Sequence, residues 1–183
     1  QSLSLLSGKK ALILGVANER SIAWGIAKAF KEHGANVALT YLNDSLKKRV
    51  EPLSIEIGAD FIAPMDVAID SHFDDLKETV SKEWGNFDIL VHSMAFANSD
   101  DLKGRFIDTS RDGFLMAHDI SAFSLVKLCK TLENNLNENA SVISMTYHGS
   151  QIVMGNYNIM GVAKASLEAA NRYLANDMGP NKK

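Results

Sequence analysis

The sequence predicts a doubly wound, Rossmann-like α/β fold, in which helices cover both faces of a parallel sheet. Short apolar runs typical of buried strands alternate with longer segments of helical periodicity. Parallel strands need crossover connections, and helical crossovers cover the sheet. Glycine or polar residues follow the strand runs, where such sheets bind ligands. With 183 residues and 46% hydrophobic content, the chain suits one core, so we predict a single domain over residues 1–183.

The first half of the chain supplies three strand and helix pairs. Strands are predicted over residues 11–14, 36–40 and 60–63, and helices over 22–33, 44–57 and 70–84. Asn43 or Asp44 should cap the second helix, and Pro52 should interrupt it. We expect Asp70 to cap the third helix and Gly85 to close it.

The second half continues the alternation. Strands are predicted over residues 87–92 and 141–145, and helices over 110–132, with a break, and 158–178. Gly179 and Pro180 should stop the last helix.

Composition excludes several classes of partner. A formal charge of −3 and a pI near 5.9 leave no basic excess to hold a phosphate backbone, so no nucleic acid is expected. No apolar run reaches the roughly 18 residues that span a bilayer, and the first residues do not resemble a signal peptide. Cys129 is the only cysteine and is expected to be a small buried hydrophobe, which suits a reducing compartment. We predict a cytoplasmic protein without a metal site or a membrane partner.

Tyr147, Tyr157 and Lys164 form the part of the chain best suited to chemistry. In a helix, Tyr157 and Lys164 lie about 700° and roughly 10 Å apart, so both side chains leave the same face. A nearby ammonium favours the phenolate and makes the tyrosine a better proton donor near neutral pH. The alternative is a core tyrosine and a solvated lysine.

The first turn suits the phosphates of a dinucleotide. Gly15, Ser21 and Gly25 stand where such a site needs a tight turn and a close approach of backbone to pyrophosphate, although the pattern G-x-G-x-x-G is absent. Asp66 follows the third strand, where a carboxylate could accept the adenine amino group. A plain turn or capping aspartate explains Asp66 equally well.

Several motifs together resemble the enoyl-acyl-carrier-protein reductases, divergent members of the short-chain dehydrogenase/reductase superfamily. They are Gly15-x5-Ser21-Ile22-x2-Gly25, Asp66-Val67, HSMAFA at 92–97, AHDIS at 117–121, and Tyr147-x9-Tyr157-x6-Lys164 followed by ASLEA. The resemblance runs from about Ser7 to Pro180, and the paired tyrosines with the lysine are its most specific part.

The resemblance implies NADH as cofactor. The implied binding residues are Gly15, Ser21 and Ile22 at the phosphates, Asp66 and Val67 at the adenine, Met94 between ribose and nicotinamide, and Lys164 at the nicotinamide ribose. NADPH stays open, because Leu42 stands where many relatives carry a glutamine beside the adenosine ribose.

The resemblance also implies the reaction, which is reduction of trans-2-enoyl-acyl-carrier-protein thioesters during fatty acid elongation. Tyr157 would hydrogen-bond the thioester carbonyl as hydride reaches the β-carbon, and so stabilise the developing enolate. Tyr147 and Ala97 would face the acyl chain, with Tyr147 assisting the proton step. Relatives of this type imply a homotetramer.

Two alternatives depend on other features. Ser144 precedes Tyr157 by thirteen residues, as the catalytic serine does in ketone and alcohol dehydrogenases of the superfamily, which keeps a carbonyl reductase open. The family pattern continues past MGP with further strands and a substrate-covering loop, so we expect a longer protein that lacks its final part here. A chain complete as written would instead be a non-catalytic dinucleotide-binding module.

Overall fold

A computed structural model describes residues 4–181 and joins the strands of this range into one five-stranded sheet of order β3-β2-β1-β4-β5. The strands are β1 (Lys10–Leu14), β2 (Asn36–Tyr41), β3 (Ile62–Pro64), β4 (Phe87–His92) and β5 (Leu136–Ser144). The pairs β1–β2, β1–β4 and β2–β3 are parallel. The strand order reverses between β1 and β4, which is where doubly wound sheets bind ligands.

The helices follow the predicted alternation. They are α1 (Ile22–Glu32), α2 (Asp44–Ile57), α3 (Asp70–Glu83), α4 (Ser99–Leu102), α5 (Arg111–His118), α6 (Ser124–Leu132) and α7 (Ile159–Met178). Short 3₁₀ turns cover Phe106–Asp108, Glu133–Asn135, His148–Ser150 and Gly179–Asn181, and a π turn covers Asp119–Phe123.

The chain forms two compact units. The first contains the described part of Gln1–Ser93 together with Thr131–Ile143, and the second comprises Met94–Lys130 and Ser144–Pro180. The first unit holds the sheet, so the predicted doubly wound fold is confirmed there. A single domain over residues 1–183 stays a prediction.

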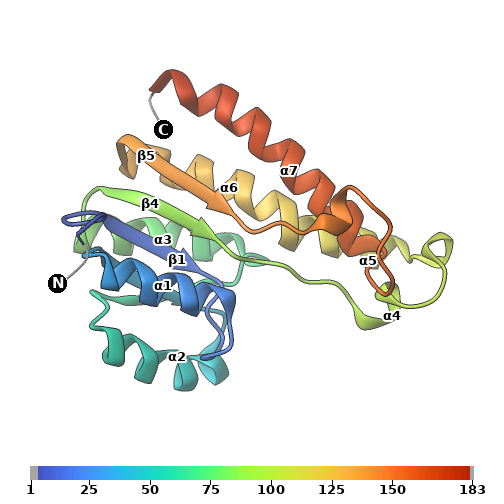
Figure 1. Cartoon of the computed structure of the whole chain (residues 1–183), viewed down its shortest axis with the longest axis horizontal. Coiled ribbons are helices and arrows are strands. Elements are labelled where there is room, and N and C mark those ends of the chain that lie inside the picture. The colour runs from blue at the N-terminus through green and yellow to red at the C-terminus, as the bar shows by residue number, and fades with distance from the viewer. Residues whose placement is uncertain (1–3, 182–183) are drawn as a thin grey trace. The chain divides into compact units, whose positions relative to one another are not determined.

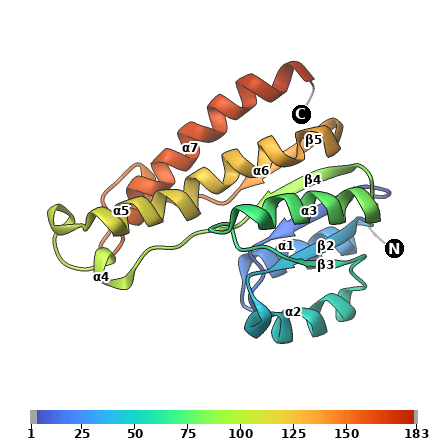
Figure 2. The same cartoon turned by 180° about the vertical axis from the view of Figure 1, so that it is seen from behind.

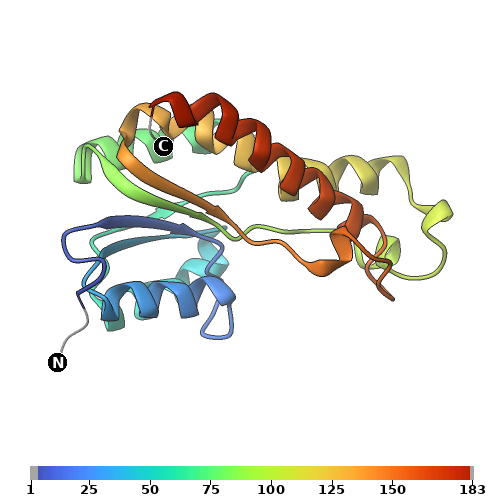
Figure 3. The ribbon, with the colours of Figure 1, turned by 45° about the horizontal axis from the view of Figure 1, so that its top comes forward.

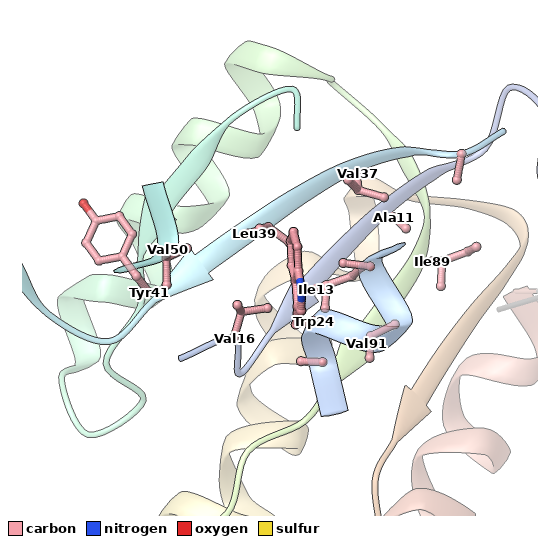
Figure 4. Close-up of a cluster of buried hydrophobic side chains, with 13 residues drawn as sticks. Ala11, Ile13, Val16, Trp24, Val37, Leu39, Tyr41, Val50, Ile89 and Val91 are labelled. Carbon is pink, nitrogen blue, oxygen red and sulfur yellow. The ribbon is translucent and has the colours of Figure 1, made fainter. Parts of the chain in front are cut away.

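The core of the first unit lies between the sheet and its helices. Trp24 of α1 and Val50 of α2 join Ile13, Leu39 and other strand side chains in one buried cluster (Figure 4). Helix α3 lies on the opposite face of the sheet from α1, as the two opposite views show (Figures 1 and 2). Its apolar face is buried through Phe73, Leu76 and Val80.

Helix boundaries confirm some sequence expectations and correct others. Asn43 caps α2 by accepting a hydrogen bond from the Leu46 amide at 3.0 Å. The predicted interruption at Pro52 is wrong, because α2 continues through this residue. Pro52 lies on the exposed side of the helix, where water can solvate the carbonyl that the proline ring leaves without its amide. Asp70 does not cap α3 but occupies its first turn, and Ile69 is the N-cap.

The second unit contains the predicted long helix with its break. Ser110 caps α5 by accepting from the Gly113 amide at 3.0 Å. The break is the π turn at Asp119–Phe123, between α5 and α6, which follow one another in nearly one direction in Figure 2. Ala117 of α5 packs against Ile159 and Ala163 of α7 in a buried cluster.

The last strand and helix differ slightly from the prediction. Strand β5 begins at Leu136, five residues earlier than predicted. Helix α7 begins at Ile159 and is preceded by the segment of residues 145–158, drawn in orange in Figure 3. Tyr157 therefore lies outside the helix that carries Lys164.

Candidate active site

Gly15 forms a turn at the end of β1 that only glycine can adopt. Its φ is +99°, and a Cβ built on it would lie 1.9 Å from the Ser93 carbonyl oxygen. Residues that carry a Cβ rarely adopt this backbone conformation, and at this position a Cβ would also clash with the Ser93 backbone. The backbones that follow β1 and β4 therefore come into close contact at the point where the strand order reverses.

Ser21 organises the segment between Gly15 and α1. It is the N-cap residue of α1, and its Oγ accepts hydrogen bonds from the Ala17 and Asn18 amides at 3.0 and 3.1 Å. Ile22, the first residue of α1, is exposed. Free amides and the positive end of the helix dipole at such a start favour anionic ligands.

Asp66 and Val67 follow β3 at the same edge of the sheet. One carboxylate oxygen of Asp66 accepts from the Ala68 amide at 2.9 Å, and the Asp66 amide donates to His72 Nδ1 at 2.9 Å. Val67 is buried. The turn role considered for Asp66 is therefore present, and its contact with adenine stays a prediction.

The strand register brings these residues of the first unit to one edge. Leu14 pairs with His92, and Tyr41 pairs with Pro64. Because all these strands run in the same direction, the residues that follow them meet at the carboxyl edge. These residues are Gly15, Leu42, Met65, Asp66 and Ser93.

The paired tyrosines lie together in the second unit. Their ring centroids are 4.8 Å apart with an interplanar angle of 65°, an edge-to-face arrangement. Tyr147 is 45% exposed, whereas Tyr157 is half-buried. The two rings are therefore in direct contact, and their shared catalytic site stays a prediction.

Lys164 is buried on α7 in the same unit. Only 6% of it is exposed, and its Nζ donates a hydrogen bond to the Met145 carbonyl at 2.8 Å. Burial lowers the pKa of the Lys164 ammonium, and the nearby Glu168 carboxylate partly opposes this shift. A lysine fixed in this way is not the solvated lysine of the alternative interpretation.

The pKa of Tyr157 shifts in the direction opposite to the prediction. Burial raises the pKa of the Tyr157 phenol, and the adjacent Tyr147 raises it further. The helical spacing argument also fails, because Asn158 has a φ of 38° and a ψ of −114°, which no helix contains. Tyr157 is therefore a neutral phenol near pH 7 that can donate a proton or a hydrogen bond.

Two glycines that no sequence motif identified surround Tyr157. A Cβ on Gly149 would lie 2.5 Å from Tyr157 Cδ1, and a Cβ on Gly161 would lie 2.6 Å from the Gly149 carbonyl oxygen. The loop and the start of α7 therefore pack directly against the Tyr157 ring. Neither glycine has a positive φ, so turn patterns could not have identified them.

Met94 and Ala97 lie in the segment that follows β4. Both side chains are half-buried, and Ala97 packs against the buried cluster of Ala117, Ile159 and Ala163. Ala97, Tyr147, Tyr157 and Lys164 thus belong to one compact unit. Their predicted contacts with cofactor and substrate remain predictions.

An apolar groove of about 400 Å³ lies beside Tyr157 in the second unit. Its lining includes Phe106, Ile152, Val153, Met154, Tyr157 and Val162.

Within residues 4–181, no three His, Cys, Asp or Glu side chains are placed to hold a metal ion. Each helix in this range is too short or too polar to cross a bilayer.

Known proteins match nearly the whole chain. The family model described as Enoyl-(Acyl carrier protein) reductase matches residues 15–183. A curated enoyl-[acyl-carrier-protein] reductase [NADH] of Rickettsia typhi is 48% identical over 177 residues, which cover 97% of this chain and 68% of that protein.

Solved structures agree with these sequence matches. The reductase of Anaplasma phagocytophilum, crystallised in complex with NAD, superposes with a TM-score of 0.95 at 42% identity and covers 98% of this chain and 69% of its own. The enoyl-acyl carrier protein reductase of Bacillus cereus, with NADP+ and indole naphthyridinone, gives a TM-score of 0.95 at 44% identity over 98% of this chain and 71% of its own.

Proposed function

We propose that this chain, which belongs to the enoyl-(acyl carrier protein) reductase family, reduces trans-2-enoyl-acyl-carrier-protein thioesters to saturated acyl thioesters with NADH during fatty acid elongation. The observation that carries the proposal is the second unit, which holds two tyrosines in edge-to-face contact together with a buried lysine. A curated relative with 48% identity bears the same activity and cofactor in its name.

The residues of the first unit fit the dinucleotide. Gly15 leaves no room for a Cβ at the turn, and the Ser21 hydroxyl accepts from the Ala17 and Asn18 amides and so fixes the loop before α1. The first amides of α1 and the positive end of its dipole suit a pyrophosphate. Ile22, Asp66 and Val67 are the further residues of this unit that we assign to the cofactor. From the second unit we assign Met94 to the cofactor and Lys164 to the ribose hydroxyls next to the nicotinamide.

The residues of the second unit would supply the electrostatic part of the reaction. A reduced dinucleotide, when bound, would supply the hydride for the β-carbon of the enoyl thioester. Negative charge then builds on the thioester oxygen, where the neutral Tyr157 phenol can donate a hydrogen bond. Tyr147 and Ala97 would contact the acyl chain, and Tyr147 would assist proton delivery to the α-carbon.

A direct assay tests the activity. With a short trans-2-enoyl thioester, the protein should oxidise NADH faster than NADPH, and a 3-ketoacyl thioester should give little turnover. The ketone assay also tests the alternative that the protein is a carbonyl reductase, which Ser144 at the end of β5 had left open. Turnover of the ketone alone would contradict the proposal, and equal rates with the two cofactors would contradict the preference for NADH.

The exposed apolar side chains of the second unit support a homotetramer. Leu115, Phe123 and Tyr173 are 59%, 52% and 77% exposed, and a neighbouring subunit could bury them. We expect sedimentation at several concentrations to give four times the chain mass, because burial of these side chains stabilises association. A monomer at all concentrations would contradict this assembly. The chain's single cysteine, Cys129, is buried and cannot form an internal disulfide, which supports a cytoplasmic location; fractionation of the source cells would test it.

A further inference from the structure

A fully buried hydroxyl in the second unit contacts the segment that carries Ala97. We propose that Ser121 is a positioning residue, whose hydroxyl holds the peptide groups of Phe96 and thereby sets the wall formed by residues 94–97. The proposal rests on the proposed function, since that wall is the one we assign to cofactor and acyl chain. No sequence pattern assigned a role to Ser121 beyond its place in AHDIS.

The contacts of Ser121 converge on one residue. Its Oγ accepts a hydrogen bond from the Phe96 amide at 3.1 Å and lies 3.4 Å from the Phe96 carbonyl oxygen. The Met160 sulfur lies 3.8 Å away on α7. A hydroxyl has one proton and two lone pairs, so it can accept from the amide while it donates to the carbonyl. Ser121 can therefore satisfy both polar backbone groups of residue 96 at once.

The two hydrogen-bond contacts of Ser121 determine how the backbone around Phe96 is oriented. Residues 94–98 form no regular secondary structure, and Ser121 is 0% exposed. Packing of the Ala97 methyl against Ala117 and Ile159 sets the position of the segment, but methyl contacts are not directional. Hydrogen bonds are directional, so the rotation of the Phe96 peptide depends on Ser121.

The backbone that presents Ser121 is also unusual. Ser121 is the central residue of the π turn Asp119–Phe123, between α5 and α6. Such turns are rare and are frequent at functional sites, because they change the direction of side chains within a helix. The π turn contacts α7, the helix that carries Lys164, so Ser121 lies where the wall and this helix meet.

Amide exchange tests the contact without reference to activity. The Ser121→Ala variant should exchange the Phe96 amide at least about tenfold faster, because its acceptor is lost. The Ser54→Ala variant is the matched control, since Ser54 is a buried helical serine that donates to the Glu51 carbonyl of its own helix. This variant should leave the Phe96 amide unchanged. Unchanged exchange in Ser121→Ala, or equally faster exchange of the β1 amides, would overturn the positioning role.

Kinetics test the consequence for the reaction. Ser121→Ala should lower kcat/KM for the enoyl thioester by about tenfold, since small misplacements of a substrate wall reduce rates strongly. Its Kd for NADH should change less than kcat/KM, because Ser121 contacts Phe96 and not Met94, the residue of the wall that we assign to the cofactor. The kcat/KM of Ser121→Cys, which keeps a weak donor and acceptor, should lie between those of Ser121→Ala and wild type. A loss no larger than that of Ser54→Ala would overturn the proposal. If the wild type does not reduce enoyl thioesters, the proposed function fails, while the exchange result still decides the role of Ser121.

Discussion

The Tyr157→Phe variant should reduce an enoyl thioester about 10² to 10³ times more slowly than the wild type, because it lacks the donor to the developing oxyanion. Its Kd for NADH should stay within about twofold, since we assign the cofactor to other residues. The ring contacts with Tyr147 and Gly149 do not involve the hydroxyl, so the fold should be retained. Stopped-flow turnover and NADH fluorescence titration at pH 7 measure the two quantities.

Tyr147→Phe is the matched control for this experiment. It removes the same hydroxyl from the other ring of the pair, which is more exposed. An assisting role predicts less than about a tenfold loss in kcat. A Tyr157→Phe rate within tenfold of wild type would contradict the mechanism. If Tyr147→Phe lost more activity than Tyr157→Phe, Tyr147 would be the residue that stabilises the oxyanion.

The sheet of the first unit could be predicted closely from the sequence. Strand β4 has the predicted bounds, and β1 and β2 differ from prediction by one residue each, because buried parallel strands leave continuous apolar runs between glycine and polar residues. Gly15, Asp66 and Ser93 lie at the predicted edge for the same reason. Cys129 is buried, as its residue type suggested.

The chemistry of the tyrosine site could be predicted only in part. The residues were identified, but the direction of the Tyr157 pKa was not, because it depends on burial that no local pattern records. The backbone beside Tyr157 was also missed. Asn156 and Asn158 both have positive φ, and Asn158 Nδ2 donates to the Gly104 carbonyl at 3.3 Å. Asn158 and Gly104 are 54 residues apart in the sequence, and a conformation that depends on such a distant contact cannot be predicted from helical periodicity.

The Gly15→Ala variant should be strongly destabilised. Positive φ strains an alanine by about 1–3 kcal/mol, and the overlap with the Ser93 carbonyl adds about 1–3 kcal/mol when the backbone shifts. The sum is a large part of the roughly 5–15 kcal/mol that stabilises a typical domain. Thermal and urea unfolding should show a much lower midpoint, and the variant should lose NADH binding because the turn at the phosphates is displaced.

Two other glycines separate the causes of this effect. Gly58 has a φ of +65°, and nothing would lie within 4 Å of a Cβ at this position, so Gly58→Ala measures the strain of positive φ alone. Gly25 lies in α1 with open space and no positive φ, and Gly25→Ala should stabilise the helix by up to about 1 kcal/mol. If Gly15→Ala costs no more than Gly58→Ala, the contact with Ser93 does not constrain the turn. If it costs several times more, the close approach of the two backbones is itself what requires glycine at this position.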